Sequence, residues 1–296
     1  MESKSMGDRV YISVVYLFLL VVLFATFYPF WNILVLSVNS ASDTIKGGIY
    51  FWPREFSFTS YKQILTDSEI LNAIVVTVAR TVIGTPLTVL VISLLSYPLS
   101  KRDLFMRRPI TLYFIFTMYF GGGLIPYYMV LKSLHLIDTF WVYIAPGLMN
   151  VFYMILVRTF IEQLPKELDE SAKIDGANDV QTFIKIILPL TMPVLATIAL
   201  FTAIGHWNAW FDSYVFTYKS SLKTLQAVLV KILNQYQTGS MVSDAQKTAD
   251  SAKRLAVSPD TIRMAATMVA TLPIVLVYPF LQRYFVKGMT LGAVKS

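Results

Sequence analysis

The apolar residues of this chain gather in runs of about 20 or more, and no other feature restricts its fold as strongly. Within the runs there is neither the period of two typical of half-buried strands nor the 3.6-residue period of surface helices. A helix that crosses a bilayer needs ~20 predominantly apolar residues, since unpaired backbone groups are costly in hydrocarbon. Hydrophobic residues make up 55% of the 296 residues and charged residues only 15%, against about 25% charged in an average soluble domain. The chain is therefore predicted to be an all-α integral membrane protein.

Six runs predict six transmembrane helices in a single transmembrane domain over residues 1–296. The first run is too long for a signal-peptide core and is followed by further spans, so we expect a helix rather than a cleaved leader. Gly121–Gly123 with Pro126 are predicted to break or loosen the outer end of the third span. The predicted spans cover about residues 10–38, 70–99, 109–131, 140–160, 184–206 and 264–286.

Positive charges orient the spans, because short cytoplasmic loops are enriched in Lys and Arg. The loop between the second and third spans, SKRDLFMRR, holds four basic residues against the single acid Asp103, whereas the next loop offers only Lys132. Both termini and the 4–5 loop are therefore predicted to be cytoplasmic. The net charge of +7 is explained by this bias, and we expect no nucleic-acid partner. In the long outer 5–6 connection, LQAVLVKILNQY and SDAQKTADSAKRLAV are predicted to be short amphipathic helices.

The polar 4–5 loop, RTFIEQLPKELDESAKIDGAND, is predicted to contain a short surface helix over about residues 165–176. Pro165 suits the first helical position, where its missing N–H costs nothing. Gly176 is the expected stop, since glycine readily takes a left-handed conformation. Asn178 or Asp179 then caps the helix that enters the membrane. From these residues alone, a solvated connector and a docking surface for another protein are equally acceptable.

The spacing of this loop resembles a known motif. Glu170-Ser171-Ala172 is followed after three residues by Gly176, and after nine more by Ile186-x-Leu188-Pro189. This pattern is similar to the EAA motif of ABC importer permeases, with Ser171 in place of the first alanine. Nearly the whole chain resembles the carbohydrate branch of that family, and GGGLIP is similar to a subgroup associated with complex or acidic oligosaccharides.

The resemblance implies that residues 165–176 form a coupling helix seated in a cleft of a separate ATPase subunit. Glu170 would pair with a basic residue of that subunit, Ser171 and Ala172 would allow close packing, and Gly176 would make the turn. Asp175 completes the candidate coupling set.

The resemblance also implies the partners. No GxxxxGK[ST] phosphate loop is present, so ATP and Mg are expected on the partner ATPase and no cofactor on this chain. The other expected partners are a second homologous permease, an extracytoplasmic solute-binding protein, an oligosaccharide and membrane lipid. The expected location is the bacterial cytoplasmic (inner) membrane.

Aromatic and polar residues near the end of the fifth span are candidates for a sugar path, because sugar sites combine aromatic faces with hydrogen-bonding groups. The candidates for stacking are Trp207, Trp210 and Tyr214, and those for binding hydroxyls are Asn208 and Asp212. The alternative is an aromatic belt at the bilayer edge, which is common.

Arg80 is the other candidate, since it falls near the expected midplane of the second span. An ionisable residue there costs at least ~2.5 kcal/mol on insertion scales and usually faces a cavity or a partner. One hypothesis is that Arg80 lines the path and favours an anionic sugar such as a uronate. The alternative is a structural pair with an acid or a carbonyl on another helix. His206 has no second ligand at metal spacing, and a pore-facing or packing role explains it better than a metal site.

The function that these observations favour is a permease subunit of an ABC importer for oligosaccharides, with acidic alginate- or pectin-derived sugars as one possibility. It is a transport subunit and not an enzyme. The alternative is a stand-alone, ion-coupled secondary transporter, which would carry intramembrane acids that the first four spans almost lack. A membrane-embedded hydrolase would need paired acids, a Ser/His pair or a metal cluster at membrane depth, and the sequence offers none.

Overall fold

The computed structural model describes residues 6–242 and 259–293, and these are nearly all helical. In that part of the chain the β structure is limited to one isolated antiparallel bridge between Asn39 and Phe56. The chain forms two compact units, Met1–Ser68 with Lys231–Leu272 and Glu69–Val230 with Pro273–Ser296. We describe each unit by itself.

The first unit contains three helices and parts of two others. It consists of α1 (Met6–Ser37), α2 (Ala41–Thr44), α3 (Thr59–Thr66), the end of α12 (Leu225–Val242) and the start of α14 (Pro259–Ala293). The side chains of α1 are exposed along most of its length, as expected of a helix that faces lipid. The loop after α2 is held by Asp43, which accepts a hydrogen bond from Arg54 Nε at 3.0 Å.

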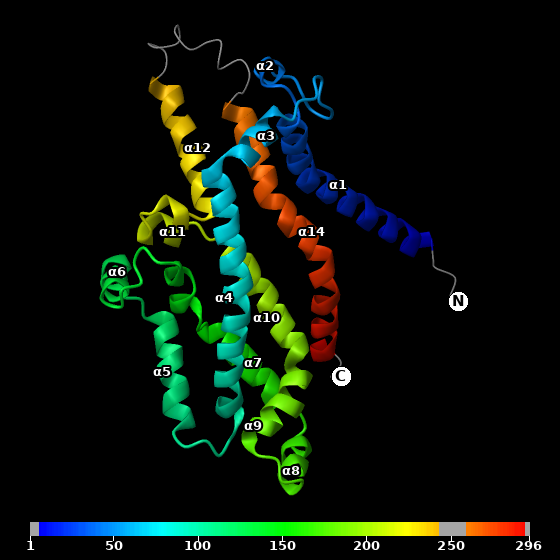
Figure 1. The fold of residues 1–296 in the computed structure, drawn as a ribbon. Helices are drawn as coiled ribbons and strands as arrows, with labels where there is room; N and C mark the ends of the chain where they lie inside the picture. The colour runs from blue at the N-terminus through cyan, green and yellow to red at the C-terminus, as the bar shows by residue number, and fades with distance from the viewer. Residues whose placement is uncertain (1–5, 243–258, 294–296) are drawn as a thin grey trace. The chain divides into compact units, whose positions relative to one another are not determined.

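The second unit holds almost all of α4 and the elements that follow it as far as α12, with the end of α14 (Figure 1). These elements are α4 (Ser68–Ser100), α5 (Arg107–Tyr119), α6 (Leu124–Ser133), η1 (Phe140–Tyr143), η2 (Ala145–Gly147), α7 (Val151–Glu162), α8 (Glu167–Ile174), α9 (Asp179–Thr182), η3 (Phe183–Ile187), α10 (Leu188–Asn208), α11 (Phe211–Phe216) and η4 (Ser220–Leu222).

The core of this unit is where α4, α7 and α10 pack together. Ile92, Met154 and Ile198 are fully buried there, one from each helix. Ser96 Oγ lies between two helices, donating to the Ile92 carbonyl of its own helix at 2.7 Å and lying 3.0 Å from the Met154 carbonyl of α7. A hydroxyl satisfied in this way can be buried without an energetic penalty. The interface between α4 and α7 is therefore fixed by both apolar packing and polar contact.

Four helices in the described residues are long and apolar enough to cross a membrane. These are Gly7–Ser37, Ser68–Ser100, Asp179–Asn208 and Asp260–Val277. They match the first, second, fifth and sixth predicted spans. Two bent helix pairs supply the remaining predicted spans, giving up to six if each pair counts as one.

The third and fourth predicted spans are both broken, although the sequence predicted a break only for the third. Helices α5 and α6 meet at 117° across the triple glycine, where Gly123 has φ +83°. The predicted break at these glycines is thus confirmed, and it is sharper than a loosened helix end. In the fourth span, residues 140–147 form 3₁₀ turns and bend by 45° from α7. Pro146, which lacks a backbone donor, explains part of that interruption.

The outer 5–6 connection is helical where the sequence predicted it at its start. LQAVLVKILNQY opens α12, which continues to Val242. The second predicted segment, SDAQKTADSAKRLAV, lies outside the described residues.

Candidate functional site

Helix α8 occupies the polar 4–5 loop, as predicted, but it begins at Glu167 rather than at Pro165. The Leu168 N–H donates to the Pro165 carbonyl at 3.3 Å, an i to i−3 contact of the 3₁₀ type. The first α-type bond to close is that from Glu170 N–H to the Lys166 carbonyl, at 3.1 Å. The proline therefore starts a tight turn that leads into the helix instead of standing at its first position.

The end of α8 follows the sequence prediction closely. Gly176 has φ +77°, its N–H donates to Lys173 O at 3.1 Å, and the Ala177 N–H donates to Ala172 O at 2.9 Å. This pair of bonds is a Schellman motif, which satisfies the last carbonyls of a helix. Asn178 then caps α9 in a reciprocal capping box with Gln181. The chain thus reverses between two well-capped helices within a few residues.

Helix α8 rests on the protein by one face. Ala172 is buried by the chain's own residues, whereas Glu170, Ser171 and Asp175 are exposed. Ile174, next to Asp175, is 85% exposed. Of the predicted coupling residues, Ala172 faces inward, and the other four, Gly176 included, lie on the exposed side.

An ion pair ties α8 to the residue that follows α4, and in the sequence its lysine indicated only the orientation of the spans. Lys101 Nζ pairs with Asp169 of α8 and lies 4.6 Å from the ring centroid of Tyr97. Burial lowers the pKa of Lys101, but the hydrogen bonds to Asp169 and Tyr97 outweigh it, so that the pKa is raised above 10.5. Lys101 is therefore charged at neutral pH. It borders a polar cleft of about 370 Å³ between this end of α4, the end of α7 and α8.

Arg80 lies in a second polar cluster, on α4 well away from α8, and its side chain is buried. Its guanidinium donates from Nη1 to Asp212 Oδ1 at 3.1 Å and from Nη2 to Asp212 Oδ2, and Nε donates to His206 Nδ1 at 3.2 Å. The guanidinium carbon Cζ of Arg80 lies over the ring of Tyr143, 4.9 Å from its centroid. The pairing with an acid on another helix, one of the two interpretations of Arg80, is what the contacts show. Whether Arg80 also selects anionic sugars stays a prediction.

Tyr143 extends the cluster into a hydrogen-bonded set that joins η1, α11 and η4. Its hydroxyl lies 3.2 Å from Ser213 Oγ and 3.1 Å from Thr217 Oγ1, and donates to the Leu222 carbonyl at 2.5 Å. These residues carried no signal in the sequence, because serine, threonine and tyrosine are common in membrane helices. A single hydroxyl thus connects segments more than 70 positions apart.

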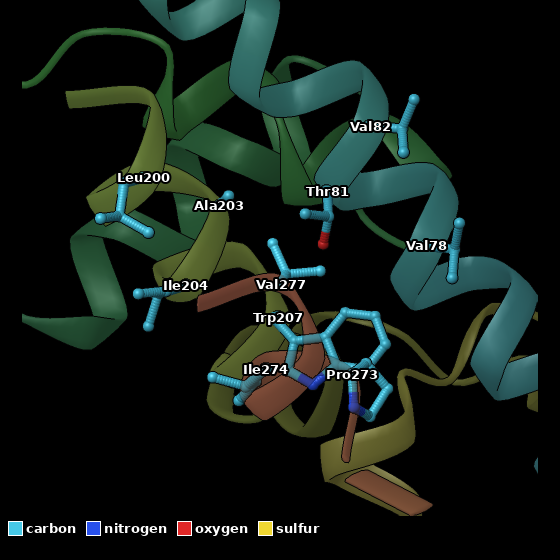
Figure 2. A pocket seen from close by; sticks show the side chains of 10 residues that line it. All are labelled: Val78, Thr81, Val82, Leu200, Ala203, Ile204, Trp207, Pro273, Ile274 and Val277. Carbon is cyan, nitrogen blue, oxygen red and sulfur yellow. The ribbon is translucent and has the colours of Figure 1, made fainter. Parts of the chain in front are cut away.

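The six residues proposed for the sugar path do not share one pocket. Asp212 forms an ion pair with Arg80. Asn208, Trp210 and Tyr214 are exposed, and the ring centroids of Trp210 and Tyr214 lie 6.1 Å apart. Trp207 instead lines an apolar cavity of about 180 Å³ bordered by α4, α10 and the second half of α14 (Figure 2).

Figure 2 shows aliphatic side chains from α4, α10 and α14 around Trp207, with the Thr81 hydroxyl among them. Such a lining offers few groups to a sugar, which needs hydrogen bonds as well as an aromatic face. The residues that line it are Val78, Thr81, Val82, Leu200, Ala203, Ile204, Trp207, Pro273, Ile274 and Val277. Within residues 6–242 and 259–293, no group of three or more His, Cys, Asp or Glu side chains forms a metal site.

Comparison with known proteins gives consistent matches. The profile of the family described as binding-protein-dependent transport system inner membrane component matches residues 64–291. The polygalacturonan/rhamnogalacturonan transport system permease protein YtcP of Bacillus subtilis strain 168 is 37% identical, over 98% of this chain and 100% of YtcP. Protein LplC of the same organism is 38% identical, over 92% of this chain and 90% of LplC.

Solved structures agree with these sequence matches. One chain in the crystal structure of a bacterial ABC transporter involved in import of the acidic polysaccharide alginate aligns with a TM-score of 0.85 and 29% identity. The alignment covers 96% of this chain and 100% of that one. The helical architecture described above is thus that of an importer permease.

Proposed function

The chain belongs to the family of binding-protein-dependent transport system inner membrane components, and from that premise we propose that it is the permease subunit of an ABC importer for acidic oligosaccharides. It is a multi-pass membrane protein that contributes to transport rather than to covalent chemistry. The sugar class follows from the relatives. YtcP is named for polygalacturonan, a chain of uronic acids, and the structural relative imports an acidic polysaccharide.

The observation that carries the coupling part of the proposal is the geometry of α8. Its inner face is held by Ala172 and by the pair between Asp169 and Lys101, while Glu170 and Ile174 are exposed. A helix fixed on one side with an acid and an apolar side chain on the other is suited to a cleft of a partner protein. In this proposal the partner is an ATPase dimer, which holds ATP and Mg and closes during each cycle.

The remaining partners complete the importer. A second homologous permease forms the other half of the path, and an extracytoplasmic solute-binding protein delivers the oligosaccharide. Both termini and α8 lie on the cytoplasmic side in this arrangement. The path for the sugar runs beside the segment from Trp207 to Tyr214, where Trp210 and Tyr214 expose aromatic faces.

Charge reversal on α8 tests this function. Glu170→Lys, in the complex of this chain with its partner permease and ATPase, is expected to abolish most sugar-stimulated ATP hydrolysis and to weaken co-purification of the ATPase. Glu167→Lys is the matched control, because Glu167 is also an exposed acid on α8, one turn earlier. Transport of sugar by this chain alone, without nucleotide, would instead identify an ion-coupled secondary transporter.

A further inference from the structure

A groove of about 550 Å³ at the start of α5 is lined by four arginines. Arg102 and Arg108 are exposed, whereas Arg107 and Arg158 are partly buried. Arg102 also borders the polar cleft beside α8, so the groove lies at the same end of the unit as α8. No acid lines the groove itself. The family assignment leaves this basic groove without a role.

The charge of the groove is incompletely neutralised. Arg107 and Arg158 share one carboxylate oxygen, Glu162 Oε1, which Arg158 Nε contacts at 2.7 Å. The nearest further acid in sequence, Asp103, sits beside Arg102. Within residues 6–242 and 259–293, neither Arg102 nor Arg108 makes an ion pair. Among the four guanidinium groups that line the groove, one carboxylate, Glu162, therefore serves two, and the other two have no ion-pair partner in the described residues.

The two partly buried arginines are held in fixed orientations. Arg107 Nε donates to the Leu99 carbonyl at 2.9 Å, and Arg158 Nη1 donates to Thr111 Oγ1 at 3.0 Å. These contacts leave other N–H groups of each guanidinium available for an anion. Guanidinium groups bind phosphate oxygens in a two-pronged geometry, and a fixed guanidinium loses little entropy in doing so. The start of α5 adds the partial positive charge of a helix N-terminus.

The surroundings of the groove are apolar. Besides the arginines and Thr111, its lining consists of Leu104, Met106, Pro109 and Leu112, and Met106 and Leu112 are more than half exposed. Beyond them, α5 continues into an apolar helix whose outward side chains include Tyr113 and Phe116. A phosphate held by the arginines would thus lie where the water-exposed loop meets the membrane-spanning segment. Basic pockets at this level are suited to lipid headgroups.

We propose that this groove binds the phosphate headgroup of an anionic phospholipid, whose acyl chains lie along α5. The charge, the fixed donors and the apolar continuation together favour a lipid over a free anion, which would not use the apolar side. They also favour it over an acidic protein surface, which would leave Met106 and Leu112 without an apolar partner.

The test compares three forms of the purified importer in a neutral detergent. They are the wild type, Arg102→Gln/Arg108→Gln, and a control, Lys62→Gln/Lys132→Gln, that removes two exposed charges far from the groove in sequence. Bound lipids are extracted and measured by mass spectrometry. We expect the groove variant to retain about one anionic phospholipid fewer per chain than the other two forms. Equal lipid retention in all three would overturn the proposal.

Two further measurements separate the other occupants. Thermal unfolding is followed while phosphatidylglycerol, phosphatidylcholine or inorganic phosphate is added. Of the three, only phosphatidylglycerol should raise the unfolding temperature of the wild type. The unfolding temperature of the groove variant should not respond to it. Stabilisation by inorganic phosphate to the same degree would show a free-anion site. Loss of a partner subunit from the groove variant, with lipid retention unchanged, would show a protein interface. Either result rejects the lipid site.

Discussion

Arg80 of α4 and Asp212 of α11 are joined by two parallel hydrogen bonds, although 132 positions separate them in the chain. The side chain of Arg80 is 5% exposed and that of Asp212 22%, so the pair is largely withdrawn from solvent. The Nε–H group of Arg80 donates a further hydrogen bond to His206 Nδ1. The pair therefore fixes the segment after α10 against α4.

Removing one member of this pair should, for at least one of the two residues, destabilise the protein more than removing both. Arg80→Gln and Asp212→Asn each leave a buried charge uncompensated, and such losses are typically about 3–5 kcal/mol. The double variant leaves no unpaired charge, so its unfolding temperature should exceed that of at least one single variant. A double-mutant cycle from thermal unfolding of the purified importer measures this coupling, and additive effects would contradict it.

The same variants test whether Arg80 selects acidic sugars. If Arg80 acts only through its contacts with Asp212 and His206, Arg80→Gln lowers uptake of acidic and neutral oligosaccharides by the same factor. A selective loss of acidic sugars would assign it a direct role in recognition. Uptake is measured in parallel with both sugar classes, with protein amounts matched by immunoblot.

Gly84→Ala should destabilise the protein, because α4 and His206 approach closely at this position. A Cβ there would lie 2.6 Å from His206 Nε2, closer than real contacts allow. Overpacking of this kind typically costs about 1–3 kcal/mol. Gly205→Ala on α10 is the control, since its Cβ would meet nothing within 4 Å. The control should retain the wild-type unfolding temperature or exceed it, and equal loss in both variants would exclude a steric cause.

Gly176 should tolerate asparagine better than valine. The position requires φ +77°, which asparagine adopts far more readily than a β-branched residue. No atom would obstruct a Cβ, so backbone strain is the expected cause of any loss. Sugar-stimulated ATP hydrolysis should follow the order glycine, asparagine, valine. Equal activity of the two variants would show that the left-handed turn is not needed for coupling.

Asp138 gives the loop before η1 an acid-sensitive contact. Its carboxylate accepts hydrogen bonds from the backbone N–H groups of Lys219 and Tyr218, which hold its pKa below the ordinary 3.8. A lowered folded-state pKa means that this stabilisation is present above pH 3.8 and is lost as the pH falls through the lower folded-state value.

Asp138→Ala should therefore lower the unfolding temperature at pH 7 and make it less sensitive to acid. Asp138→Asn keeps an acceptor oxygen and tolerates the local φ of +58°, so it should fall between alanine and the wild type at pH 7. Thermal unfolding from pH 3 to pH 7 measures both variants. If the unfolding temperatures of the wild type and Asp138→Ala changed with pH in parallel, this carboxylate would not be the source of the acid sensitivity.

Local features were predictable from the sequence, apart from the start of α8 at Glu167 rather than Pro165, and long-range ones were not. The stop at Gly176 and the cap at Asn178 follow from the conformational preferences of single residues, and both are observed. Arg80 was recognised as unusual and Asp212 was a candidate for binding sugar hydroxyls, but one sequence contains no signal that two distant residues pair. The bend before α7 was not predicted, because apolar composition indicates that a segment lies in lipid but says little about the direction of its helix axis.

The partial burial of α8 illustrates a different limit. Ala172 was expected to face a partner because it lies in a shared motif, yet the chain itself covers it. Asp169, which anchors the helix to Lys101, looked like one of several acids in a first turn. Which of several equivalent acids meets a base depends on the rotation of the helix about its axis, and a surface helix of eight residues has too few apolar positions to fix that rotation from sequence.

The segment Asp179–Asn208 runs for 30 residues through α9, the π-helical turn η3 and α10, which makes it about 45 Å long at 1.5 Å per residue. It starts directly after the capped turn that follows α8 and carries His206, the neighbour of Arg80, near its far end. It can therefore behave as a lever. A tilt of about 5° around its middle would move each end by roughly 2 Å, in opposite directions. A displacement of about 2 Å at the Asp179 end would then move His206, at the other end, by a similar distance in the opposite direction, next to the buried pair of Arg80 and Asp212.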